Sequence, residues 1–97
     1  MRQITIDSVR AFRSGANFKR GNMEVRHYHE AESWSELRLH GNPIAYLSKD
    51  GLQISTCGWN TVTTRERLNG LPGVHVIQRK GQLYLNGEAW SGALITI

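Results

Sequence analysis

The feature that most limits the fold of this chain is a series of short segments in which apolar and polar residues alternate. "MEVRHYH" (23–29) and "SELRLHG" (35–41) alternate with a period of two, which is typical of strands with one buried face. "PIAYLS" and "LQIST" flank "KDG", and "VHVIQ" and "LYLNG" flank "RKG", so a glycine ends each of these tight turns. Strands this short, joined by turns this tight, indicate antiparallel pairing with one face toward the core.

A different spacing precedes these strands. In "TIDSVRAFRSG" (5–15) the apolar residues recur at intervals of three and four, which predicts a short amphipathic helix. The residues expected on its buried side are Ile6, Val9, Ala11 and Phe12. We expect Thr5 to be the N-cap and Gly15 to take the left-handed conformation after the last turn.

A second helix is expected within "ISTCGWNTVTTRERLNG" (54–70), which also holds the only cysteine and four threonines. Thr63 precedes Glu66 by three residues, the spacing of a capping box, and Gly70 ends the segment. We therefore interpret the threonines mainly as a strand end and a helix cap. The expected core contacts of this stretch are Trp59 and Leu68.

Together these patterns predict an α+β fold in a single domain over residues 1–97. Its expected elements are a short N-terminal helix, a four-stranded antiparallel meander, a second short helix and three to four C-terminal strands. Ninety-seven residues allow one modest core. No apolar run approaches the ~18 residues of a membrane-spanning helix, and a single cysteine forms no internal disulfide. We therefore expect a cytoplasmic protein without a membrane partner.

Three long blocks of the chain resemble a widespread family of small proteins encoded by tailed bacteriophages and prophages. They are "ITIDSVRAFRSGANFKRGN", "LHGNPIAYL" and "ISTCGWNTVTTRERLNGLPGVHVIQRKGQLYLNGEAWSG", so the similarity extends from residue 4 to residue 92. The most specific part is "GWNTVTTRERLNGLPGV" followed by "QRKG" and "YLNG". The resemblance implies a phage protein in the host cytoplasm. It brings no enzymatic motif and no catalytic residue.

Few residues suggest catalysis or a cofactor. Cys57 lacks a catalytic signature and is expected to be a half-buried small side chain, since no histidine is placed beside it by the sequence. His27 and His29 lie on one strand face and are weak candidates for a metal site, but no spacing specifies a third ligand. Glu30 and Glu32 fall in a turn, where carboxylates are solvated. We therefore predict a non-enzymatic protein without cofactor or metal.

Basic residues give the clearest candidate for a binding site. Twelve Lys and Arg against eight Asp and Glu leave a formal charge of +4, which permits contact with phosphates or an acidic protein. The first predicted contact surface combines the first helix with the segment after it, and its members are Arg10, Arg13, Phe18, Lys19 and Arg20. Secondary candidates are Arg65 and Arg67 near the start of the second helix, and Tyr28 as a stacking side chain.

These observations favour a non-enzymatic phage accessory protein that binds and modulates a host macromolecule. Host defence complexes, including CRISPR effectors and other nucleoprotein complexes, and host transcription or replication machinery are the expected partners. One alternative is a phage protein that binds nucleic acid directly, and another is a minor component of the virion or of its assembly. The sequence leaves the oligomeric state open.

Overall fold

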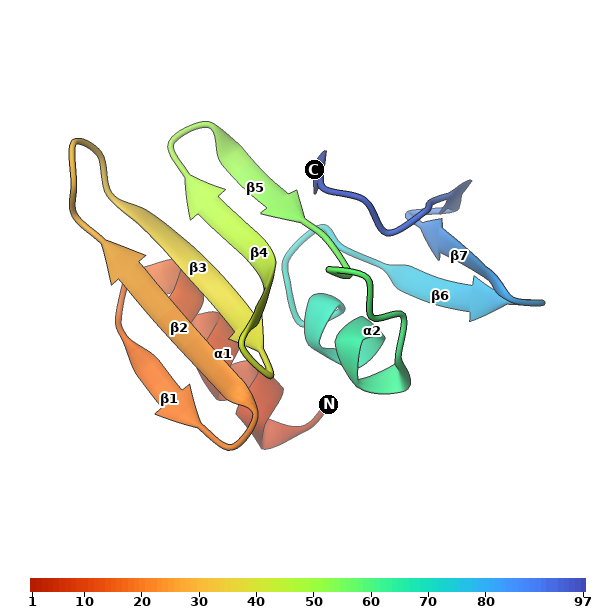
Figure 1. Ribbon diagram of the computed structural model, residues 1–97, viewed down its shortest axis with the longest axis horizontal. Coiled ribbons are helices and arrows are strands. Elements are labelled where there is room, and N and C mark those ends of the chain that lie inside the picture. The colour runs from red at the N-terminus through yellow and green to blue at the C-terminus, as the bar shows by residue number, and fades with distance from the viewer.

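The computed structural model describes residues 1–97 and has two helices and nine strands, which confirms the α+β class. In chain order the elements are α1 (Gln3–Ser14), β1 (Phe18–Arg20), β2 (Met23–Tyr28), β3 (Trp34–Leu39), β4 (Asn42–Ser48), β5 (Gly51–Ile54), α2 (Val62–Leu68), β6 (Val76–Arg79), β7 (Gln82–Leu85), β8 (Glu88–Ala89) and β9 (Ile95–Thr96) (Figure 1). No helix is long and apolar enough to cross a membrane.

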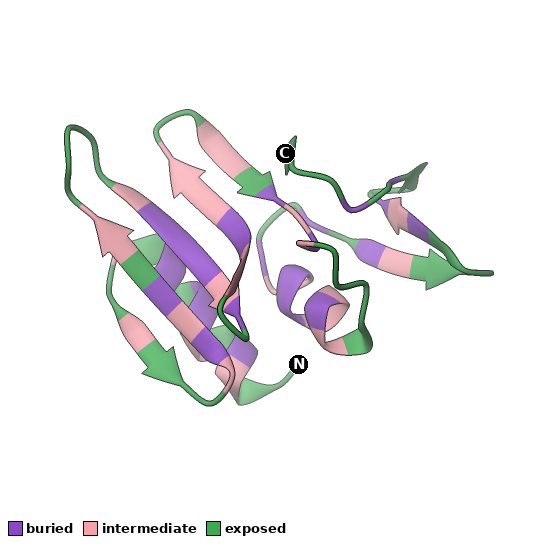
Figure 2. Cartoon of the chain, in the orientation of Figure 1, coloured by how far each residue is buried: buried purple, intermediate pink, exposed green.

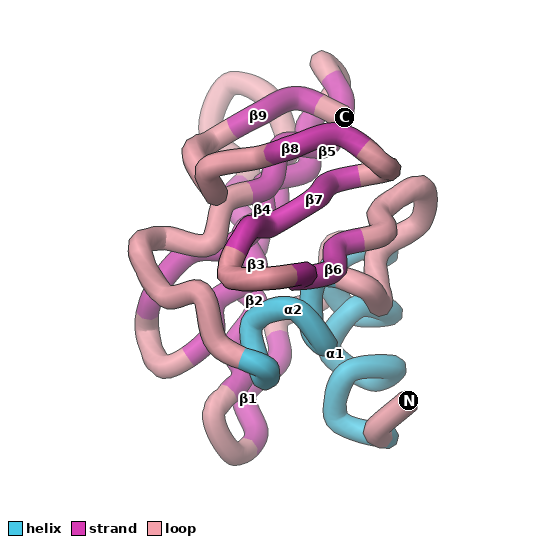
Figure 3. The backbone as a smooth tube through the Cα atoms, turned by 90° about the vertical axis from the view of Figure 1, so that its right-hand side faces the viewer, coloured by secondary structure: helices cyan, strands magenta, loops and turns pink.

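The strands form two antiparallel sheets. The first has the order β1-β2-β3-β4-β5-β9, and the second has the order β6-β7-β8. The predicted four-stranded meander corresponds to β2 to β5, extended on one side by β1 and on the other by β9. Figure 1 shows α1 behind the first sheet and α2 between the two sheets. The helices gather at one end of the molecule in the side view (Figure 3).

The core lies between α1 and the rear face of the first sheet, and continues around α2 toward the second sheet. Val9 and Phe12 of α1 are buried, as are Met23 and Val25 of β2. Their burial follows the period of each element, and Figure 2 shows it concentrated in the middle strands and the inward sides of the helices. Further core residues are Leu37, Leu39, Ile44, Ala45, Ile54, Leu68, Leu71, Val74, Val76, Leu83, Leu85 and Trp90.

The start of α1 differs from the prediction. The helix begins at Gln3, after Arg2, which provides no side-chain cap, so the expected N-cap at Thr5 is wrong. Thr5 is instead fully buried within the helix, where its hydroxyl donates a hydrogen bond to the carboxylate of Glu66. Ile6 was expected to be buried but is 38% exposed. The left-handed conformation of Gly15, with φ of 76°, is confirmed.

The start of α2 also differs. Thr61 is the N-cap, and its Oγ1 accepts the backbone N–H of Thr64 at 3.1 Å, so the expected Thr63–Glu66 capping box is wrong. The Glu66 carboxylate bonds to α1 and is therefore not available to the helix start. Leu68 is buried as predicted.

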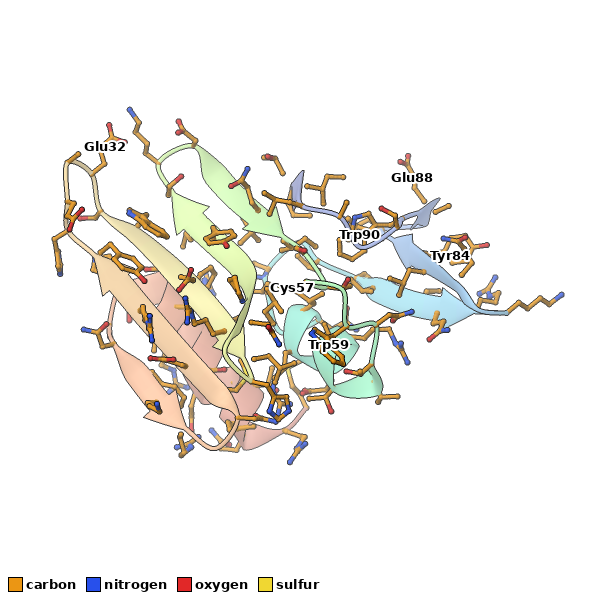
Figure 4. The ribbon with its side chains drawn as sticks, viewed as in Figure 1. Glu32, Cys57, Trp59, Tyr84, Glu88 and Trp90 are labelled. Atoms are coloured by element: carbon orange, nitrogen blue, oxygen red, sulfur yellow. The ribbon has the colours of Figure 1, made fainter.

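Trp59 was expected in the core but is 60% exposed. The chain leaves β5 through a tight turn in which Cys57 and Gly58 have φ of 54° and 82°. The turn is closed by a hydrogen bond from the Trp59 N–H to the Thr56 carbonyl at 2.9 Å. Trp59 follows this reversal on the exposed connection to α2 (Figure 4).

Candidate functional site

A groove runs along the outer side of α1. It has a volume of about 480 Å³ and is lined by Met1, Ile6, Val9, Arg10, Arg13, Ser14 and Gly70. Arg10 and Arg13 are three residues apart and exposed, so they lie on the same side of the helix. Ile6 and Met1 add exposed apolar surface, and no carboxylate is among the lining residues. We call this hollow the α1 groove.

Gly70 explains how the end of α2 comes to line this groove. A Cβ atom at this position would lie 2.6 Å from the Thr5 Cγ2 atom and 3.2 Å from the Val9 Cγ2 atom. The absence of a side chain therefore lets the loop after α2 approach α1 closely. This contact between segments more than sixty positions apart could not be read from the local pattern of either helix.

Asp7 lies beside Arg10 on α1 and partly neutralises the positive charge at this edge of the groove. Arg20 Nη2 lies 2.6 Å from Asp7 Oδ2, and Arg10 Nη1 lies 4.0 Å from Asp7 Oδ1. The hydrogen bond from Arg20, followed by one from Gln3, lowers the pKa of Asp7 below its ordinary value. Arg20 is thus already paired with a carboxylate, whereas Arg13 has no acidic partner.

The other two members of the predicted basic surface lie on β1. Phe18 is half-buried against the core, and the Arg20 guanidinium sits over its ring, 5.2 Å from the centroid. Lys19 projects from the opposite face of the strand, where it is paired in register with Glu24 of β2. The structure therefore places Arg10 and Arg13 in the α1 groove and Arg20 at Asp7 outside it. Phe18 is half-buried, and Lys19 lies on the other face of β1.

The front face of the first sheet carries an aromatic group and a set of ion pairs. Tyr28 and Trp34 stack with ring centroids 4.2 Å apart, and Tyr46 lies 6.2 Å from Trp34. On the same face, Arg26 and Arg38 each bond to a neighbouring glutamate, at 3.0 Å and 2.5 Å. The bond from Arg26 is the main cause that lowers the pKa of Glu24 below its ordinary value. No helix covers this face (Figure 1).

The arginines of α2 are both engaged within the chain. Arg65 Nη1 donates to Asn60 Oδ1 at 2.7 Å. Arg67, predicted as a surface contact, is only 1% exposed, because its guanidinium bonds to Glu66, to Thr5 and to Asn22. The structure places it in the interior. The sequence Arg-Glu-Arg did not indicate the burial of Arg67, since the same sequence is equally typical of a solvent-exposed helix face.

The residues considered for catalysis or metal binding do not gather into one site. Cys57 is half-buried in its turn, and Glu32 lies at the tip of the β2–β3 loop, where it bonds to Lys49 at 2.8 Å (Figure 4). His27 and His29 contact each other edge to face, with centroids 4.5 Å apart, and His27 Nδ1 lies 2.8 Å from Ser35 Oγ. No group of three or more His, Cys, Asp or Glu side chains is placed to hold a metal ion.

Comparison with known proteins gives the chain its family. The model of the family described as Kyanoviridae Gp96 protein matches residues 1–94. The chain belongs to this phage protein family. No curated protein matches it, and neither does any solved structure. The resemblance to phage proteins noted in the sequence is thereby confirmed at the level of a phage family.

This Kyanoviridae Gp96 family member has a second hollow that the sequence did not predict. It has a volume of about 430 Å³ and lies between the β3–β4 turn and the connection from β5 to α2. Its lining residues are Leu39, His40, Asn42, Ile44, Thr56, Trp59, Thr61, Thr63 and Thr64. The cluster of threonines was the available signal, but it was interpreted mainly as a strand end and a helix cap. We call this hollow the threonine pocket.

Proposed function

We propose that this phage protein is a small non-enzymatic accessory protein that binds and modulates a host protein, with the α1 groove as its contact surface. The observation that carries the proposal is the composition of the groove. Arg10 and Arg13 stand beside the exposed side chains of Met1 and Ile6, and no carboxylate lines the hollow. Such a surface fits a partner segment that is acidic and also presents an apolar side chain.

The energetics of interfaces support this assignment. Arginine is enriched among the few residues that contribute most of the binding energy at protein interfaces, especially where apolar contact excludes water around it. Arg13 has no ion-pair partner within the chain, so it gains a carboxylate partner without first losing one. Met1 and Ile6 supply the exposed apolar surface that a partner side chain would cover.

The alternative of direct nucleic-acid binding has less support from the arrangement of the side chains. Bases stack on free aromatic faces, but of the aromatic side chains predicted as contacts, Phe18 lies under Arg20 and Tyr28 is stacked on Trp34. Trp59 is exposed, but no Lys or Arg lines the hollow beside it. The arginines of the front sheet face are paired with Glu24 and Glu36, which reduces the charge offered to phosphates. We therefore place a host protein, including one within a defence complex or the transcription or replication machinery, before nucleic acid and before a virion component.

Capture from a host lysate tests the proposal, with the captured proteins quantified before and after nuclease treatment. We expect the parent protein to retain a small set of host proteins after nuclease, and the double variant Arg10→Glu/Arg13→Glu to lose them by at least about tenfold. The matched control is Arg79→Glu/Lys80→Glu, which makes the same charge change at two exposed residues, the last of β6 and the first of the turn to β7. Melting temperatures of all three proteins should agree, since exposed charges add little to stability.

Three outcomes would contradict the proposal. Equal capture by the parent and the α1 double variant would remove the α1 groove as the contact surface. Equal loss in both double variants would indicate a general charge effect. Release of all partners by nuclease, together with a steep fall in affinity for unrelated DNA or RNA as salt increases, would favour the nucleic-acid alternative.

A further inference from the structure

The threonine pocket shares no residue with the α1 groove and has a different chemical character. None of its nine lining residues is Asp, Glu, Lys or Arg, although such residues make up 21% of the chain. The arginines of the adjacent helix are turned to other partners, since Arg65 bonds to Asn60 and Arg67 to Glu66. A charged ligand such as a nucleotide would find no counter-ion in the lining of this pocket.

Some polar side chains of the pocket form hydrogen bonds within the protein, and others have no partner there. Thr61 Oγ1 and Thr64 Oγ1 are 2.9 Å apart and form the helix cap, and Thr56 Oγ1 donates to the Gly92 carbonyl at 3.4 Å. The side chains left without a hydrogen-bond partner in the chain are His40, Asn42, Trp59 and Thr63. Three of these side chains both donate and accept, and the Trp59 indole donates.

Trp59 gives the pocket a flat apolar wall at the surface. Its side chain is 60% exposed, and it is among the most exposed large apolar side chains of the protein. Leu39 and Ile44, both buried in the sheet, add apolar atoms to the lining. A volume of about 430 Å³ lies within the usual range for small-molecule sites, ~300–1,000 Å³.

We propose that the threonine pocket binds a neutral sugar ring. Each hydroxyl of a sugar donates and accepts a hydrogen bond, which matches the Asn42 amide, the Thr63 hydroxyl and the His40 imidazole. The C–H face of the ring packs on the exposed indole of Trp59, which supplies apolar contact area on one side only. A nucleoside also has a flat ring, but its base offers one fixed pattern of donors and acceptors, and its phosphorylated forms meet no cation here.

Titration with methyl glycosides, followed by NMR, tests this site directly. The probes are the methyl glycosides of glucose, galactose, mannose and N-acetylglucosamine, with uridine and adenosine as the competing class. We expect at least one glycoside to give a saturable shift of the Trp59 indole N–H resonance. The indole N–H of Trp90 is bonded to the Ala93 carbonyl at 3.0 Å and serves as an internal reference that does not move.

Variants separate binding in the pocket from non-specific contact. Trp59→Ala and Asn42→Ala should each weaken glycoside binding by at least about tenfold while the melting temperature changes little, because both side chains lie at the surface edge of the pocket. The Trp59 indole resonance reports binding in Asn42→Ala. Trp59→Ala lacks that indole, so its binding is followed by the backbone amide resonances of residues 56–64. Val62→Ser, a change at a 74% exposed residue outside the lining, should bind as the parent does.

The proposal fails in any of three ways. The first is the absence of a saturable shift with every glycoside at concentrations well above the millimolar range. The second is binding of a nucleoside in preference to all glycosides. The third is unchanged glycoside affinity in both Trp59→Ala and Asn42→Ala.

Discussion

The hydroxyl of Thr5 in α1 donates a hydrogen bond to the carboxylate of Glu66 in α2, with Oγ1 and Oε1 2.6 Å apart across 61 positions of sequence. Arg67 also bonds to the same Glu66 oxygen, and donates to Thr5 Oγ1 at 3.1 Å and to Asn22 Oδ1 at 3.2 Å. One buried guanidinium thus joins α1, α2 and the turn between β1 and β2. The Glu66 Oε2 and Arg67 Nε atoms remain without partners in this buried group.

Glu66→Gln should destabilise the protein by about 3 kcal/mol, because it leaves the buried Arg67 guanidinium without its carboxylate. Urea denaturation measures the free energy of unfolding. Glu88→Gln is the control, since Glu88 is exposed and forms no ion pair, and it should change stability by less than about 0.5 kcal/mol. Similar stability in both variants would show that the Arg67 charge is satisfied by its other partners.

The same group predicts an acid-dependent loss of stability. Burial alone would raise the pKa of Glu66, but the hydrogen bonds from Thr5 and Arg67 outweigh it and place the pKa below its ordinary 4.5. A carboxyl whose pKa is lower in the folded state stabilises above the unfolded pKa, and this contribution disappears as pH falls through the folded pKa. The stability difference between parent and Glu66→Gln should therefore shrink as pH falls from about 6 to about 3. A difference that is constant with pH would contradict the lowered pKa.

The cap of α2 predicts different stability effects for substitutions at Thr61 and at Thr63. Thr61→Ala should cost about 0.5–2 kcal/mol, because the Thr64 N–H loses its acceptor at the helix start. Thr63→Ala should cost much less, since Thr63 lies within the helix and makes no capping bond. Thermal or urea unfolding of the two single variants decides the matter, and the reverse order would restore the register expected from the sequence.

Gly70 predicts a clash that a second substitution relieves. Gly70→Ala should destabilise by about 1–3 kcal/mol, because its Cβ would meet the Thr5 methyl group at 2.6 Å. Adding Thr5→Ser removes that methyl group and keeps the hydroxyl that donates to Glu66, so it should recover part of the loss. The double variant is compared with each single variant by urea denaturation. Strict additivity of the two effects would mean that the strain arises at Val9 or at the Arg67 carbonyl instead.

Local patterns predicted the parts of the fold that depend on neighbouring residues. The spacing of two between Met23 and Val25, and between Leu37 and Leu39, predicted which face of the meander is buried. The burial of Arg67 was not predictable, because it depends on a threonine and an asparagine more than forty positions away.

In the candidate site, too, the sequence predicted what depends on neighbouring residues and missed what depends on the arrangement of strands and turns. The three-residue spacing of Arg10 and Arg13 predicted their common exposure on one helix, and both line the α1 groove. Lys19 and Arg20 were assigned to the same surface because the strand β1 was not foreseen, and strand geometry turns adjacent side chains to opposite faces. The threonine pocket depends on the turn in which Cys57 is left-handed. Non-glycine residues seldom adopt this conformation, so the sequence did not predict the turn.

The position of β9 has a consequence for the order in which the protein assembles. Strands β1 to β4 pair only with neighbours along the chain, whereas β5 also pairs with β9, which follows only after α2 and the whole second sheet. The Gln53–Thr96 hydrogen bond spans 43 positions, so its formation closes a longer loop and has a higher entropic cost than the hairpins of the meander. We therefore expect the meander to form before β9 pairs with β5, since the meander needs only local contacts.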